Sequence, residues 1–264
     1  MQKRFIFIPV LLIVLIALPV SGQRRGKTPK PPEPPSQTVK EPAADTKPAA
    51  KKNLRGESKP TVAAAVGGSF THIYEFTRPD FIVSRVAIRH DDNGIGEIEF
   101  SKSGADEAIT DPIRLSFTTL GRIEAALSEL RFLDSKEHYQ FEKDYSHLGT
   151  MTFTLRTDER SRTVSYNWTD NKAAKALMDE YRKIGHQYIW MFDMGLSREN
   201  QPLDAPRLMT ALDGYLRRGE ISDPEQMLPF LTGLSSEERI PMIARNHAEQ
   251  IVARIKKQSE KAKK

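Results

Sequence analysis

The chain has 264 residues, of which 38% are apolar and 28% are charged, a composition typical of a soluble protein with one or two domains. It contains no cysteine, which excludes disulfides, thiol chemistry, cysteine-ligated zinc and a lipid-modified cysteine anchor. Residues 1–60 contain 12 Lys or Arg and 4 Asp or Glu, whereas residues 61–264 contain 28 and 31, so the larger part is mildly acidic and is not expected to bind nucleic acid.

The first 22 residues are typical of a secretory leader. A basic start is followed by an apolar run of 16 residues, 5–20, and then by the small residues Ser21 and Gly22. A helix that spans a bilayer needs about 20 apolar residues, and two prolines interrupt this shorter run. We therefore predict a signal peptide over residues 1–22 that is cleaved rather than kept as an anchor, and a periplasmic or secreted location.

Residues 23–66 are predicted to be a disordered linker. Between Gln23 and Pro60 there are eight prolines and ten basic residues, and only two large apolar side chains. Such a segment cannot form a core, so we expect a semi-extended spacer that holds the folded part away from a surface. Its lysines could also bind an anionic cell-wall polymer.

An α+β domain is predicted over residues 67–195, and it begins with strand-like residues followed by a hairpin. Alternation of apolar and polar residues fits a register in which Ile88 pairs with Ile98 and Val86 with Phe100. This register requires a loop with an odd number of residues, which we expect to contain Gly94 in the left-handed conformation.

A second hairpin is predicted further along this domain. Its expected pairs are Met151 with Trp168, Phe153 with Tyr166 and Leu155 with Val164. This register puts the turn at Glu159 and Arg160. Both hairpins then have their large apolar side chains on one face, which favours an antiparallel sheet covered by helices on that face.

Each hairpin is followed by an amphipathic pattern with apolar residues three and four positions apart, so the predicted order is hairpin, helix, hairpin, helix. Ser116 is expected to cap the first helix, and Thr169 or Asp170 the second. The predicted apolar stripes are Leu120, Ile123, Leu127 and Leu130 in the first helix, and Ala174, Leu177, Tyr181, Ile184 and Tyr188 in the second.

A small all-helical segment is predicted over residues 196–264, with a frayed Lys-rich end. Its expected boundary residues are Asp204 as a cap, Gly219 as an end, the capping boxes Ser222/Glu225 and Ser235/Glu238, Gly233 as a stop signal and Pro241 as the start of the last helix. The last helix is expected to place Ile243, His247, Ile251 and Ile255 on its apolar stripe.

The polar connection over residues 134–149 contains the candidate catalytic residues His138, Asp144 and His147. Imidazoles and carboxylates that converge can bind a metal or exchange protons near neutral pH. The spacing, however, lacks the His-Glu-x-x-His arrangement that presents two ligands on one helical face. We favour a solvated loop whose aromatic side chains pack on the edge of the sheet, and we predict no metal and no cofactor.

The outward face of the second hairpin is predicted to be rich in hydroxyl groups. Its candidate ligand-binding residues are Thr152, Thr154, Arg156 and Asn167. Such a face could bind a saccharide or another polymer through hydrogen bonds. Threonine is also common at solvated strand positions for its β-propensity alone.

Five short segments resemble a group of predicted exported bacterial proteins with no assigned function. They are residues 89–92 (RHDD), 130–135 (LRFLDS), 166–169 (YNWT), 198–203 (RENQPL) and 240–247 (IPMIARNH). The resemblance covers roughly residues 70–258 and implies a bacterial envelope setting, but it assigns no catalytic residue.

We therefore predict an exported, non-enzymatic binding or scaffolding module of the bacterial envelope, whose partner is an envelope protein or an anionic cell-wall polymer. One alternative is an envelope hydrolase or metal-dependent enzyme that uses the loop over residues 134–149. Another is that the helical segment binds a partner helix.

Overall fold

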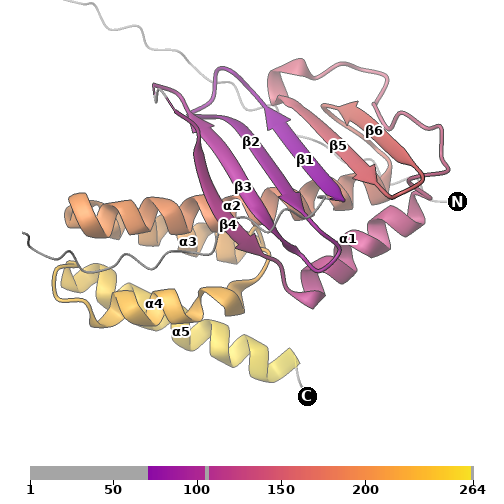
Figure 1. Ribbon diagram of the computed structural model, residues 1–264. Helices are drawn as coiled ribbons and strands as arrows, with labels where there is room; N and C mark the ends of the chain where they lie inside the picture. Colours follow the sequence, from indigo (N-terminus) through magenta and orange to yellow (C-terminus); the bar gives the residue numbers. More distant parts are fainter. Residues whose placement is uncertain (1–70, 105–106, 263–264) are drawn as a thin grey trace, which may run out of the picture. The chain divides into compact units, whose positions relative to one another are not determined.

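Figure 1 shows a computed structural model that describes residues 71–104 and 107–262. The predicted signal peptide (1–22) and linker (23–66) lie outside the described residues. In the described part of the chain, no helix combines the length and the apolar composition that crossing a membrane requires.

The fold is α+β, as predicted, with a six-stranded antiparallel sheet in the order β4-β3-β2-β1-β5-β6. The strands are β1 (His72–Thr77), β2 (Val83–His90), β3 (Ile95–Lys102), β4 (Ile109–Arg114), β5 (Thr150–Arg156) and β6 (Ser161–Tyr166). The α-helices are α1 (Phe117–Glu129), α2 (Lys172–Asn200), α3 (Ala205–Arg218), α4 (Leu228–Ser236) and α5 (Met242–Ala262). The first half thus contributes four strands before α1, and β1 joins them to β5.

Strand β4 was not predicted from the sequence, because it is short and contains Pro112. Proline lacks the N–H that an interior strand needs, so it normally argues against a strand. Here β4 is at the edge of the sheet and pairs only with β3, where a missing donor is tolerated.

The register of the first hairpin is confirmed. Ile88 lies opposite Ile98 and Val86 opposite Phe100. Gly94 has a φ of 74°, which glycine adopts without the strain that a side chain would cause. A Cβ at this position would also lie 2.9 Å from the Cβ of Leu115, so both backbone conformation and space require glycine here.

The predicted register of the second hairpin is wrong by two residues. Phe153 lies opposite Val164 and Met151 opposite Tyr166, and the turn is formed by Asp158 and Glu159 instead of Glu159 and Arg160. Side chains alternate between faces with a period of two, so a shift by two residues leaves each apolar side chain on its predicted face. The apolar pattern therefore cannot distinguish these two registers.

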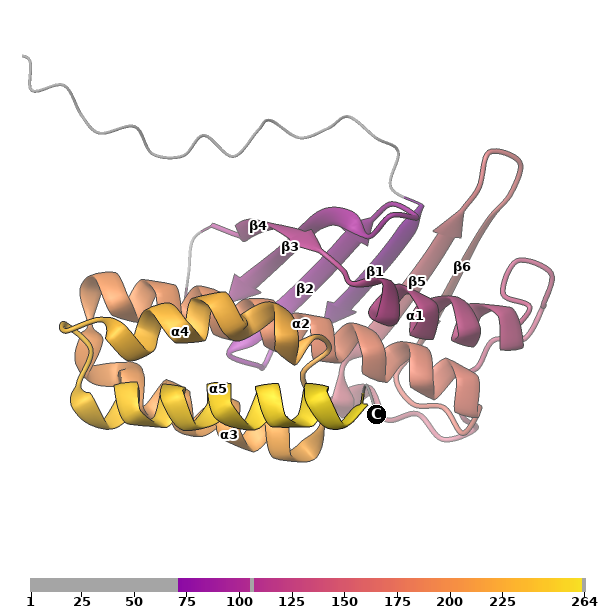
Figure 2. The same ribbon diagram turned by 90° about the horizontal axis from the view of Figure 1, so that it is seen from below.

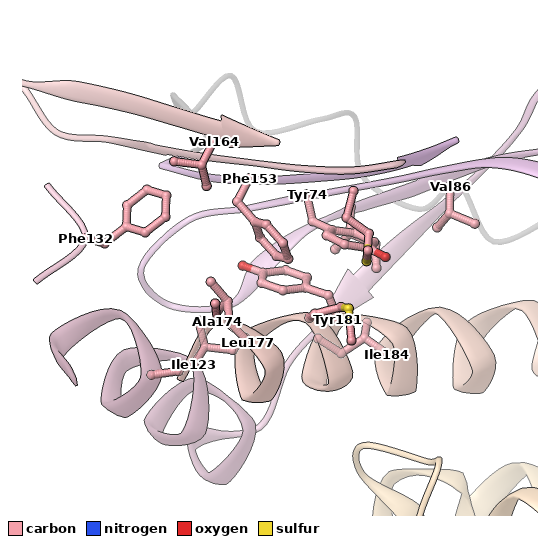
Figure 3. Packing of buried hydrophobic residues seen from close by; sticks show 14 of the residues in the cluster. Tyr74, Val86, Ile123, Phe132, Phe153, Val164, Ala174, Leu177, Tyr181 and Ile184 are labelled. Carbon is pink, nitrogen blue, oxygen red and sulfur yellow. The ribbon is translucent and has the colours of Figure 1, made fainter. Parts of the chain in front are cut away.

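Helices α1 and α2 lie along the same face of the sheet (Figures 1 and 2). Figure 3 shows how Tyr181 of α2 reaches up between Tyr74 and Phe153 of the sheet, while Ile123 of α1 packs beside Leu177 of α2. Ser116 caps α1, as predicted, because its side chain accepts a hydrogen bond from the N–H of Thr119.

The predicted cap of α2 is wrong. Asn171 caps this helix, and its side chain accepts hydrogen bonds from the N–H groups of Ala173 and Ala174. Thr169 instead lies before the cap, where its hydroxyl accepts a hydrogen bond from the N–H of Asn171. Thr169, Asp170 and Asn171 are all residue types that can cap a helix, so sequence alone does not choose between them.

A second core lies between the C-terminal half of α2 and the helices α3, α4 and α5. Trp190 and Met194 of α2 pack there with Leu212, Leu231 and Ile255. The boundary predicted between residues 195 and 196 lies inside α2, which runs without a break from Lys172 to Asn200.

Several helix signals of the C-terminal segment were misinterpreted. Gly233 and Ser235 lie inside α4 and neither stop nor cap a helix. Ser222 is buried and hydrogen-bonded to Glu180 rather than capping. Ile243 is 68% exposed, because the buried stripe of α5 instead passes through Ala244, Ala248, Ile251, Val252 and Ile255. Gly219 ends α3 in the left-handed conformation, as predicted.

Candidate functional site

The outward face of β5 and β6 carries two pairs of hydroxyl groups. Thr152 and Ser165 are cross-strand neighbours whose hydroxyl oxygens lie 2.9 Å apart, and those of Thr154 and Thr163 lie 2.8 Å apart. Within each pair one hydroxyl donates to the other, which leaves one O–H and several lone pairs free to face outward. The pairs are therefore held in place and can still bind a polar ligand.

Asn167 follows β6 and, by the alternation of the strand, continues this outward row. Its side-chain oxygen accepts hydrogen bonds from the amide of Gln140 at 2.9 Å and from the N–H of Tyr145 at 3.2 Å. Its own amide donates to the carboxylate of Asp144. Asn167 was predicted as a ligand-binding residue, but these bonds use its side chain to fix the loop beside the hydroxyl pairs.

The other anchor of this loop is Arg162 on β6. Its guanidinium donates to the carbonyl oxygens of Phe132 and Glu137, and to the hydroxyl of Tyr139 at 3.1 Å. Tyr139 itself is buried, with a φ of 58° that few residues other than glycine adopt. β6 is an edge strand, and a loop held against such an edge protects it from pairing with other chains.

The anchored loop forms an aromatic cluster with the residue that follows Asn167. The ring centroid of Tyr145 lies 5.8 Å from that of Trp168, 6.3 Å from Phe141 and 6.0 Å from His147. Trp168 remains 39% exposed. We call these four side chains and the four paired hydroxyl residues the hydroxyl–aromatic surface.

The candidate catalytic residues His138, Asp144 and His147 are all exposed on this loop. The carboxylate of Asp144 accepts a hydrogen bond from the amide of Asn167, and His147 packs against Tyr145. In residues 71–104 and 107–262, no three His, Asp or Glu side chains form a group that could hold a metal ion. Arg156 lies at the exposed end of β5, where its N–H donates to the carbonyl of Thr71.

The remaining half of the outward face is occupied by charges that pair with one another. Arg85 donates to Glu75 at 2.7 Å and also to Glu99, while Arg89 lies 3.2 Å from Glu97. The hydrogen bond from Arg85 lowers the pKa of Glu99, so this carboxylate stays ionised. Because these charges pair with one another, they leave fewer free polar groups than the hydroxyl pairs of β5 and β6 do.

Two hollows in the described part of the chain are lined mainly by residues outside this surface. The larger, of about 290 Å³, is formed by Lys102 and residues of α2 and α3, among them Asp193 and Arg207. The smaller, of about 10 Å³, lies beside His72 and Tyr181 and has room for about one water molecule. The loop histidines line neither of them.

The loop's aromatic side chains were expected to pack on the edge of the sheet, but no pattern in the sequence combined Phe141 and Tyr145 with Trp168. Trp168 was assigned to the second hairpin as the partner of Met151. The polar residues Asn167 and Gln140, which hold the rings together, lie 27 positions apart. The signal that could have indicated the cluster is the aromatic content of the loop together with a tryptophan just after a strand.

A scan against protein-family models gives no match to this chain, and a search of curated proteins likewise finds no related sequence.

Proposed function

We propose that the protein is an exported, non-enzymatic binding module of the bacterial envelope, and that the hydroxyl–aromatic surface binds a polyhydroxylated cell-wall polymer. The predicted leader supports export, and the predicted linker supports a folded part that is held away from a surface. The resemblance of five short segments to exported bacterial proteins belongs to the same proposal.

The single observation that carries the proposal is that Asn167, which continues the outward row of β6, also anchors the loop whose Tyr145 ring packs on Trp168. A sugar ring presents C–H groups on its faces and hydroxyls at its rim. Trp168 and Tyr145 offer apolar, amphipathic ring surface at little cost in side-chain entropy. The pairs Thr152/Ser165 and Thr154/Thr163 offer donors and acceptors at fixed positions.

A retention assay on insoluble peptidoglycan tests the proposal. The mature chain, residues 23–264, and the folded part alone, residues 67–264, are expected to be retained with affinities of the same order. Trp168→Ala should weaken retention by about tenfold or more, since buried aromatic anchors commonly contribute more than 1 kcal/mol to binding. Thr152→Val with Thr163→Val should weaken it by less.

Two matched controls separate binding from general surface effects. Phe117→Ala removes a ring that is 92% exposed at the start of α1, and Thr110→Val removes an exposed hydroxyl from β4 at the far side of the same face. Both variants should be retained like the unchanged chain. Two outcomes would contradict the proposal: residues 23–66 alone are retained, or Trp168→Ala is retained like the unchanged chain. Either outcome would assign binding to the basic segment.

A further inference from the structure

Two histidines from neighbouring strands form a buried stacked pair at one end of the sheet. His72 of β1 lies opposite His90 of β2, with ring centroids 4.6 Å apart and an interplanar angle of 9°. His90 is fully buried and His72 is 9% exposed. Both project to the inner face of the sheet, toward Tyr181 of α2.

The hydrogen bonds of His90 define its tautomer. Its Nδ1 lies 2.8 Å from the carbonyl oxygen of Asp91, which can only accept, so Nδ1 carries the proton. Its Nε2 lies 2.9 Å from the hydroxyl of Tyr181 and is therefore the acceptor of that O–H. A second proton on His90 would occupy this lone pair, so the contact that joins β2 to α2 could persist only if the Tyr181 hydroxyl turned and accepted instead of donating.

His72 connects the pair to the surface. Its Nε2 lies 3.2 Å from a carboxylate oxygen of Asp92, and the Asp92 side chain is 75% exposed. The same oxygen accepts a hydrogen bond from the hydroxyl of Thr71 at 2.7 Å. The charged groups that face the pair are Asp91 and Asp92 of the β2–β3 turn and Glu124 of α1, and from α2 the titratable group is the phenol of Tyr181.

We infer that the stacked pair His72/His90 is a pH-sensitive latch that holds this end of the sheet to α2 at neutral pH and opens on acidification. A proton on either ring puts a cation into the apolar layer against the other imidazole. A proton on His90 also forces the Tyr181 hydroxyl to change from donor to acceptor inside the core. The response requires no ligand and is separate from the hydroxyl–aromatic surface.

The direction of the pH effect follows from burial. Desolvation lowers the pKa of His72, although Asp92 opposes this, and desolvation together with the neighbouring His72 lowers the pKa of His90 to about 4. Below the ordinary pKa of 6.5 the unfolded chain therefore binds protons that the folded chain does not. The contribution of the neutral pair to the free energy of unfolding is fully present above that pH and decreases as the pH falls toward 4.

Thermal unfolding of the mature chain from pH 7 to pH 5 tests the latch. The ratio of folded to unfolded protein should fall by about 20-fold through His90 alone, which lowers Tm by about 4–7 °C. In His72→Gln with His90→Gln this part of the pH dependence should disappear. The exposed pair His138→Gln with His147→Gln is the matched control and should keep the full slope.

His186 of α2 is partly buried, and desolvation lowers its pKa, so the variant without the latch keeps a smaller pH dependence that His186→Gln measures. Equal slopes for the latch variant and the unchanged chain would overturn the inference.

NMR of the unchanged chain gives a readout that does not depend on the variants folding. The Nε2 of His90 should have the chemical shift of an unprotonated nitrogen down to pH 5, and on acidification amides at the β1–β2 end should lose protection from hydrogen exchange before those of α3 and α5. An imidazole of His90 that titrates near 6.5, or a uniform loss of protection, would overturn the latch.

Discussion

The two cores of the protein are filled in different ways. In the described part of the chain, the core between the sheet and α1 and α2 contains seven buried aromatic residues, whereas the core of the C-terminal helices contains one, Trp190. Buried alanines at 205, 244 and 248 occupy the helical core, and small residues let helices approach closely. Large rings fill the layer between a sheet and its helices, where there is more space between the backbones.

This difference determines where buried polar chemistry occurs. The tyrosines of the sheet core bring hydroxyl groups that need partners, so Tyr166 donates to the carbonyl of Ala174 at 2.8 Å and Tyr181 to His90. Burial raises the pKa of both phenols, which keeps them neutral as donors. The pH-sensitive contacts therefore gather in the sheet core, while the helical core depends mainly on close packing.

A polar cluster and one helix connect the cores. Glu180 of α2 is buried, and its carboxylate accepts hydrogen bonds from Arg122 of α1 at 2.7 Å and from Ser222 at 2.6 Å. Burial alone would raise the pKa of Glu180, but these hydrogen bonds outweigh it and the pKa is lowered. Asp223 next to Ser222 accepts from the hydroxyl of Ser116 at 2.5 Å, at the start of α1.

The largest expected effect comes from opening the helical core. Trp190→Ala removes a ring that is 3% exposed and an N–H that donates to Leu208 at 2.8 Å, and should lower the free energy of unfolding by about 3–5 kcal/mol. Because α2 belongs to both cores, thermal unfolding should remain a single transition when followed by the near-UV circular dichroism of the tyrosines. A separate, unshifted transition of the sheet core would contradict the coupling of the cores.

A smaller effect is expected from the cluster between them. Glu180→Gln removes the charge that Arg122 and Ser222 bind and should cost about 2 kcal/mol in chemical denaturation at pH 7. Since the pKa of Glu180 is lowered, its contribution is present above the ordinary value of 4.5 and is lost as the pH falls below it.

The neighbouring carboxylate provides the control for this variant. Asp179 is half-buried and pairs with Lys175 and Arg182 on the surface of α2, so Asp179→Asn should change the free energy of unfolding by less than about 0.5 kcal/mol. Equal effects of the two substitutions would show that the Glu180 cluster does not join the cores.

The smallest expected effects come from two glycine-to-alanine substitutions, which should change the free energy of unfolding in opposite directions. Gly233→Ala, inside α4 with no atom within 4 Å of the new Cβ, should stabilise the protein by about 0.5–1 kcal/mol in denaturant titrations. Gly94→Ala in the first hairpin should instead destabilise it, because φ is +74° and Leu115 is too close. A stabilising Gly94→Ala would contradict the predicted strain at this turn.

The difference between these glycines illustrates how far the sequence could be interpreted. Gly94 follows Asp-Asp-Asn between two alternating segments, a local pattern that specifies a turn by itself. Gly233 was interpreted as a helix stop, yet α4 continues through it, because Leu231 and Leu234 are buried against the second core. Packing of a whole helix outweighs the propensity of one glycine.

The candidate site was predictable only in part. Thr152 and Thr154 could be assigned to an outward face because strand alternation depends on neighbouring residues alone. The role of Asn167 as the anchor of residues 140–145, and the meeting of Tyr145 with Trp168, depend on contacts over more than 20 positions. No periodic pattern reports such contacts.

The sequence by itself determined the apolar faces of the two hairpins and of α1 and α2, the first hairpin's register and the cap of α1, because these depend on interactions within a few residues. The tertiary structure decided the register of β5 with β6, the partners of Ser222 and Glu180, and the stacking of His72 on His90. In each case the local sequence permits more than one arrangement equally well, and only contacts between distant segments select one of them.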